Sequence, residues 1–164
     1  MEVKWPAPPV GFLKIDGAFN HVTRKGGVGF VIRDDRGVML AGRACPLRGL
    51  LSPEHGEVLA CKKAMEFVVY HFFSRIILET DALAVQMLLA ATVDSNTTVL
   101  GWIYDDLILL LGLETFVKVT HVGRLGNNVA HQLAAHACSL QQDCFYFSTP
   151  SFLLAAIVAK LCSM

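Results

Sequence analysis

The sequence predicts an α/β fold in which helices pack on the faces of a mixed β-sheet. Three observations lead to this fold class. Three short apolar runs joined by turn-forming residues open the chain, which favours an antiparallel meander. Helical and strand-like segments then alternate, which is typical of parallel strand connections. The 164 residues contain no repeat, linker or low-complexity tract, so we expect one domain over residues 1–164.

The meander begins after a proline-rich segment, residues 1–10, which we expect to be extended. The first strand ends at Asp16-Gly17, and Gly26-Gly27 breaks the chain before the second strand. A tight turn over residues 34–37 leads into the third strand. The predicted strands cover residues 12–15, 28–33 and 38–44.

The second part of the chain opens with a helix-start signature at Ser52-Pro53-Glu54, where a capping residue precedes proline and an early acid. Apolar residues then recur at helical spacing. In a later helix, Asp105 and Asp106 mark the solvent side. The remaining predicted elements are strand 75–80, helix 82–91, helix 97–111, strand 115–122, helix 127–140 and an apolar C-terminal extension over residues 148–164.

The composition is apolar for a soluble domain, with 54% hydrophobic and 17% charged residues. Charged residues average about 25% in such domains. A membrane-spanning helix needs roughly 18 uninterrupted apolar residues. Asp105 and Asp106 interrupt the apolar run 99–113, and Pro150 interrupts the run 144–159. We therefore expect no membrane span, a heavily buried sheet and an apolar surface.

The charges of the chain balance, because Lys and Arg number 14 and Asp and Glu also number 14. No overall positive field steers such a chain onto nucleic acid. Nucleic-acid binding would therefore require a local patch or a metal site.

The five cysteines are scattered and include no C-x-x-C pair. This pattern disfavours a disulfide scaffold or a zinc module and fits a reducing, intracellular compartment. The N-terminal residues lack the apolar core of a secretory signal. The sequence does not distinguish the cytoplasm from the nucleus.

Two acids stand out in the first half of the chain. Asp16 ends an apolar run and precedes glycine, which suits either a metal ligand at a strand end or the start of a turn. Glu57 lies in the first turn of a helix, where the helix dipole favours a carboxylate. It shares a face with Cys61 and Met65, which we expect to lie against the sheet. A charge on that face is costly unless it is paired or binds a cation.

A third acid follows the buried strand 75–80. By alternation Glu79 and Asp81 point the same way, and Asp81 is also suited to cap the next helix. Asp16, Glu57 and Asp81 each lie at a strand end or helix start, so they can converge on one edge of the sheet. Such oxygen ligands suit Mg²⁺. Two such ions would activate water and stabilise the leaving oxygen in phosphodiester cleavage.

An ordered set of motifs runs from Trp5 to about residue 159. The set comprises Trp5-Pro6 with Pro8-Pro9, Lys14-Ile15-Asp16-Gly17-Ala18, the run 26–34 (GGVGFVIRD), Glu57-Val58-Leu59-Ala60, Glu79-Thr80-Asp81 and Asn127-x-x-Ala130-His131-x-Leu133-Ala134. These motifs resemble the plant ribonuclease H-like domain related to the ribonuclease H part of non-long-terminal-repeat retrotransposon reverse transcriptases.

The resemblance implies a five-stranded mixed sheet in the order 3-2-1-4-5, with helices on both faces. It also implies hydrolysis of the RNA strand of RNA–DNA hybrids with Mg²⁺ or Mn²⁺. The implied ligands are Asp16 on the first strand, Glu57 on the first helix and Asp81 after the fourth strand. The fourth ligand position, a carboxylate in active members, is His131 here.

A neutral imidazole is a poorer partner than a carboxylate for hard Mg²⁺. We therefore hypothesise that His131 weakens the second metal position, which gives slow, Mn²⁺-preferring or absent hydrolysis. His121 resembles the mobile histidine that transfers protons in type-1 ribonucleases H, and the alternative is a polar residue at a strand end.

Two further residues are candidates for nucleic-acid contact. Gly17 would permit close approach to a ribose hydroxyl, or it is an ordinary turn glycine. Asn127 would contact substrate, or it caps the last helix.

Three functional hypotheses follow, and the first is a ribonuclease H. The second is a retroelement-derived module that binds nucleic acid or a protein partner, with Phe72-Phe73 and residues 145–152 as an apolar partner surface. The third is a degenerate copy without activity. None of them requires a small-molecule cofactor or a membrane.

Overall fold

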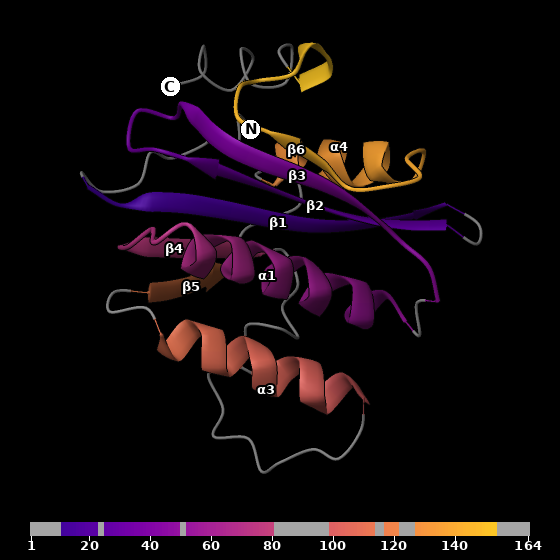
Figure 1. The fold of residues 1–164 in the computed structure, drawn as a ribbon, viewed down its shortest axis with the longest axis horizontal. Helices are drawn as coiled ribbons and strands as arrows, with labels where there is room; N and C mark the ends of the chain where they lie inside the picture. The colour runs from indigo at the N-terminus through magenta and orange to yellow at the C-terminus, as the bar shows by residue number, and fades with distance from the viewer. Residues whose placement is uncertain are drawn as a thin grey trace.

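The computed structural model describes residues 11–22, 25–49, 52–80, 99–113, 117–121 and 127–153. They form a six-stranded mixed sheet with helices on both faces (Figure 1). The elements are β1 Leu13–Val22, β2 Lys25–Arg33, β3 Met39–Leu47, α1 Pro53–Tyr70, β4 Ile76–Thr80, α3 Val99–Gly112, β5 Val117–His121, α4 Asn128–Ala137 and β6 Cys144–Tyr146.

The strand order is β5-β4-β1-β2-β3-β6. The meander β1-β2-β3 is antiparallel, and β4 and β5 join it in parallel. This confirms the predicted fold class and the order 3-2-1-4-5. The sixth strand, β6, was not predicted. It pairs antiparallel with β3 through only three residues.

Alternation along the strands divides the core into two layers. Ile15, Phe30 and Ile32 pack with α1 and, through it, with Tyr104 and Leu107 of α3. The neighbouring residues on the same strands face α4. That second layer comprises Ala18, Val31, Met39, Ala44, Val129, Ala130, Leu133, Ala134, Ala137 and Leu153.

The predicted start of the first helix is confirmed. The Ser52 hydroxyl accepts a hydrogen bond from the backbone N–H of His55 at 3.1 Å, and Pro53 occupies the first turn. The predicted turn at residues 34–37 also forms, since Asp34 O accepts from the N–H of Gly37. In α3, Asp105 and Asp106 are exposed, as expected.

Two predictions about glycine were wrong. β1 does not end at Asp16-Gly17 but continues to Val22, because its second half pairs with the start of β2. Gly26 and Gly27 do not break the chain but lie within β2. A Cβ atom on Gly27 would stand 2.4 Å from Ala134 O, and one on Gly29 would stand 2.6 Å from Ala134 N. These two glycines therefore allow α4 to approach the sheet closely.

No helix within the described ranges is long and apolar enough to cross a membrane. Four of the five cysteines lie in the described part of the chain, and all four are free. The predicted helix 82–91, the segment 1–10 and most of the C-terminal extension lie outside the described residues.

Candidate active site

The candidate site lies at the step in the sheet where the described pairing of β1 with β4 ends. β1 pairs with β4 only from Leu13 to Gly17, whereas β1 itself continues to Val22. Beyond Gly17 the structure describes no β4 residue beside this edge of β1, since the described part of this segment ends at Thr80. Side chains from both faces of the sheet can meet at such a step.

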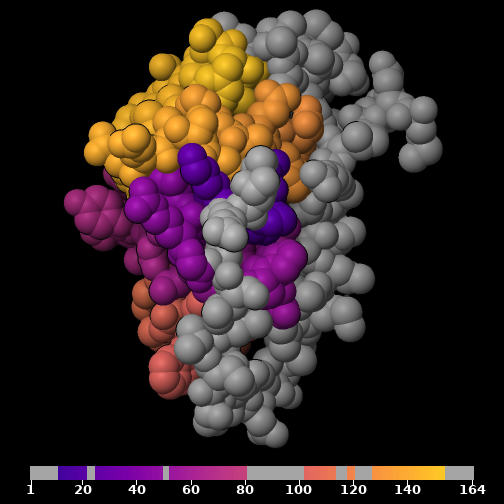
Figure 2. All heavy atoms as spheres, turned by 90° about the vertical axis from the view of Figure 1, so that its right-hand side faces the viewer, coloured from indigo at the N-terminus to yellow at the C-terminus, as the bar shows by residue number. Residues whose placement is uncertain are grey.

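The first turns of α1 cover β1 at this step. A Cβ atom on Gly17 would lie 3.7 Å from the backbone of Ala60, and one on Gly56 would meet the ring of Phe19. Glu57 lies between these two contacts along the helix and is half-buried. The face turned to the viewer in Figure 2 brings together indigo atoms of β1, purple atoms of the segments that follow it and orange atoms of α4.

Asp16 is buried on the opposite face from α1, and its main partner is Arg33 of β2. Arg33 Nε–H donates to Asp16 Oδ2 at 3.1 Å, and both side chains are 1% exposed. With the acids ionised, Asp16 Oδ1 is also buried and accepts no hydrogen bond from the residues that the structure describes. Arg33 therefore holds one oxygen of this carboxylate, and the other accepts no hydrogen bond from the described residues when Glu79 is ionised.

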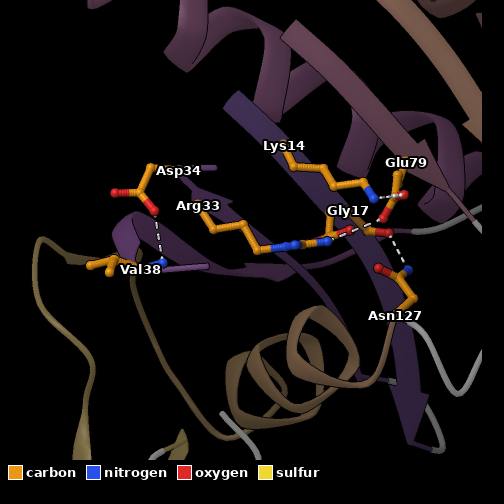
Figure 3. Close-up of polar contacts among 8 residues, drawn as sticks. Lys14, Gly17, Arg33, Asp34, Val38, Glu79 and Asn127 are labelled. Atoms are coloured by element: carbon orange, nitrogen blue, oxygen red, sulfur yellow. Dashed lines mark hydrogen bonds and ion pairs between the residues drawn. The ribbon is translucent and has the colours of Figure 1, made fainter. Parts of the chain in front are cut away.

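Glu79 completes a buried network with these residues (Figure 3). Its Oε1 lies 2.5 Å from Lys14 Nζ, and its Oε2 lies 3.6 Å from Arg33 Nη2. The sequence predicted that Glu79 and Asp81 point the same way, so that one or both face the site. Glu79 lies beside Asp16 in the sheet and is engaged by the chain's own cations.

Glu79 also gives the fold a pH dependence. Burial raises the pKa of its carboxyl from the ordinary value of 4.5 to about 8, helped by a hydrogen bond with Asp16 and by the charge of Asp16 and opposed by Lys14. The unfolded chain releases this proton near pH 4.5, whereas the folded chain keeps it until about pH 8. The contribution of Glu79 to the free energy of unfolding is therefore complete below pH 4.5 and is lost as the pH rises to about 8.

We expect the free energy of unfolding to decline over this window and the Glu79→Gln variant to show a flatter profile. Urea unfolding across the pH range measures both slopes. An equally steep decline in the variant would contradict the assignment to Glu79.

Asn127 does not cap α4 through its side chain, as the sequence had favoured. Among the described residues no side-chain capping bond forms at this position. Asn127 Nδ2 instead donates to Gly17 O at 2.7 Å, across 110 positions in sequence, and Asn127 is 1% exposed. Asn127 therefore ties the start of α4 to β1 beside Asp16.

His131 follows Asn127 by one helical turn, and its N–H donates to Asn127 O at 3.1 Å. Because Asn127 donates a hydrogen bond to Gly17 O, the half-buried His131 one turn later lies on the β1 side of α4. Gly17 lies within a strand, so the turn interpretation of this glycine was wrong.

His121 ends β5, and its backbone is in register with Thr80 at the end of β4. Its side chain lies outside the described part of the structure. Asp81 follows Thr80 in the chain and also lies outside it.

The donor set fits a divalent cation in part. Asp16 Oδ1 is buried and accepts no hydrogen bond from the described residues when Glu79 is ionised, and carboxylates suit hard ions. Among the described residues, however, no group of three or more His, Cys, Asp or Glu side chains stands close enough to hold a metal. The ligand set Asp16, Glu57, Asp81 and His131 therefore stays a prediction.

Lys14 and Arg33 were not among the predicted site residues. A signal was present, because Lys14 precedes Asp16 by two positions on a strand and so shares its face. Arg33 ends an apolar strand, and nothing local indicates that its charge is buried.

Several solved structures share this fold. Ribonuclease H1 from the halophilic archaeon Halobacterium salinarum superposes with a TM-score of 0.66 at 25% identity, covering 77% of this chain and 95% of that one. LC11-RNase H1 in complex with an RNA/DNA hybrid superposes with a TM-score of 0.65 at 18% identity, covering 77% of this chain and 96% of that one. The prototype foamy virus protease-reverse transcriptase superposes with a TM-score of 0.62 at 17% identity, covering 85% of this chain and 22% of that one.

The fold therefore defines a ribonuclease H-like domain. A family model described as reverse transcriptase-like matches residues 14–137, and the chain belongs to that family. A comparison with curated proteins found no match.

Proposed function

We propose that this domain is a metal-dependent endonuclease that hydrolyses the RNA strand of RNA–DNA hybrids. The observation that carries the proposal is Asp16, a buried acid near the point where the described pairing of β1 with β4 ends, whose Oδ1 accepts no hydrogen bond from the described residues when Glu79 is ionised. The likeness to LC11-RNase H1, which was solved with such a hybrid, supports the choice of substrate. The match to a reverse transcriptase-like family is in keeping with descent from a retroelement. The relation to plant members rests on the motif resemblance alone.

Asp16, Glu57, Asp81 and His131 would hold the metal ions. Bound divalent ions supply an activated water and stabilise charge on the leaving oxygen. The chain's own residues orient these ligands: Arg33 holds Asp16, and Asn127 holds α4 against β1. Gly17 and Asn127 are the proposed nucleic-acid contacts, and His121 the proposed proton-transfer residue.

The Glu57→Gln variant tests the proposal with little disturbance of the fold, because Glu57 is half-buried. We expect cleavage of a labelled RNA–DNA hybrid in Mg²⁺ or Mn²⁺ to fall about 100-fold when a metal-holding carboxylate becomes an amide. The matched control is Glu66→Gln, an exposed acid further along α1. The proposal would be refuted by wild-type activity in Glu57→Gln, or by absent cleavage in the wild-type chain.

Replacing His131 with Asp tests the fourth position. A carboxylate there should bind Mg²⁺ better than a neutral imidazole, so we expect about 10-fold faster cleavage in Mg²⁺ and a weaker preference for Mn²⁺. The measurement is the ratio of cleavage rates in the two metals. His136→Asp, on the same helix, is the control. Equal Mg²⁺ rates in the wild-type and His131→Asp chains would contradict the hypothesis.

A second candidate function is an interaction module that uses exposed aromatic side chains. Tyr70 is 78% and Phe147 65% exposed, and Phe145 lines a pocket of about 270 Å³ together with Phe67 and His71. Large exposed apolar patches commonly mark binding surfaces. A thermal unfolding temperature indifferent to millimolar Mg²⁺ and Mn²⁺, together with absent cleavage, would favour this module.

A further inference from the structure

Arg33 is a fully buried arginine beside the candidate metal ligands. A buried guanidinium is costly unless it is paired and hydrogen-bonded. Its Nε–H donates to Asp16 Oδ2, and its Nη2 lies 3.6 Å from Glu79 Oε2. The guanidinium thus bridges two acids on neighbouring strands (Figure 3).

The backbone around Arg33 departs from regular pairing. The register between β2 and β3 shifts between Ile32 and Arg33, so that Arg33 is opposite Met39. Such bulges re-aim a side chain and are common beside active sites. The next residue anchors the strand end, because Asp34 Oδ1 accepts from the N–H groups of Arg36 and Val38 at 2.9 Å each.

We propose that Arg33 is a positioning residue for Asp16, an inference that rests on the proposed metal-dependent function. The Nε–H fixes Oδ2, so that the carboxylate presents Oδ1 to a divalent cation. The planar guanidinium supplies donors in a fixed geometry, which a flexible ammonium does not. Lys14 engages Glu79 at 2.5 Å, so the second acid has a cation of its own.

The affinity for Mn²⁺, measured by electron paramagnetic resonance without substrate, tests this role. Removing a group that holds a metal-binding carboxylate typically costs 10–100-fold in affinity. We expect a loss of that size in Arg33→Met and a partial loss in Arg33→Lys, which retains a donor. The matched control is Arg43→Met, which breaks the partly buried ion pair with Asp143 away from the site. A folded Arg33→Met chain with wild-type affinity would overturn the proposal.

A measurement on the wild-type chain covers the case in which Arg33→Met does not fold. Mg²⁺ binding to Asp16 should shift the Arg33 Nε–H resonance in nitrogen-15 spectra, with the same midpoint as displacement of Mn²⁺. An unshifted resonance while the metal binds, or no Mn²⁺ binding at all, would overturn the proposal. A chain whose Mn²⁺ affinity depends on Arg33 but which cleaves no hybrid would refute the nuclease and leave the positioning role intact.

Discussion

Replacing Asp16 with Asn is expected to lower hybrid cleavage by about 10³-fold and the free energy of unfolding by about 3–5 kcal/mol. The two losses have different causes. The change removes a proposed metal ligand, and it leaves the buried guanidinium of Arg33 beside a neutral amide. Cleavage assays and urea unfolding measure the two losses separately.

A double variant separates the two causes. Asp16→Asn combined with Arg33→Met removes both charges, and apolar replacement of a buried ion pair is often close to neutral for stability. We expect stability to recover in large part while cleavage stays lost. Asp105→Asn, on the exposed side of α3, is the control. Recovery of cleavage in the double variant would contradict the role of Asp16 as a ligand.

The second large effect concerns Gly29, which lies beneath α4. A methyl group there would stand 2.6 Å from Ala134 N and 2.9 Å from Ala130 O, both backbone atoms. We expect Gly29→Ala to lower the free energy of unfolding by about 3 kcal/mol, because α4 must move away from the sheet. Thermal or urea unfolding provides the measurement.

Gly17→Ala is the strand-matched control for this prediction. Its new methyl group would meet Ala60 at 3.7 Å, an ordinary contact distance. We expect this variant to keep its stability within about 1 kcal/mol. Equal losses in the two variants would show that glycine in a strand, and not the approach of α4, accounts for the effect.

The meander, the long helix and the parallel strands were predictable because their signals are local. Periodicity and the Ser52 cap indicate a helix whatever lies elsewhere in the chain. The glycines were misinterpreted because a glycine pair in the sequence has two possible causes: a break in the chain, or the close approach of another element. Gly26-Gly27 looked like a chain break, yet Gly27 accommodates a helix that lies about a hundred residues later. β6 was missed because three residues carry too little pattern.

The candidate site likewise combines residues with local sequence signals and residues whose role depends on contacts between distant segments. Asp16 and Glu57 could be proposed from the sequence because acids at strand ends and helix starts are conspicuous. Lys14 and Arg33 were missed because the burial of a charge depends on its neighbours in space. Asn127 was assigned to the helix that it precedes, whereas its partner is a carbonyl on β1.

By itself the sequence determined the fold class, whereas the order of the first five strands was implied by the resemblance to a known family. Residue type and position suggested the candidate acids, and their role stays a proposal. Periodicity, capping and residue type are properties of short segments, so they can be read along the chain. Only the tertiary structure decided that Arg33 engages Asp16 and that Lys14 engages Glu79. Those contacts between distant segments fix Oδ2 of Asp16, the residue with which the proposed function begins.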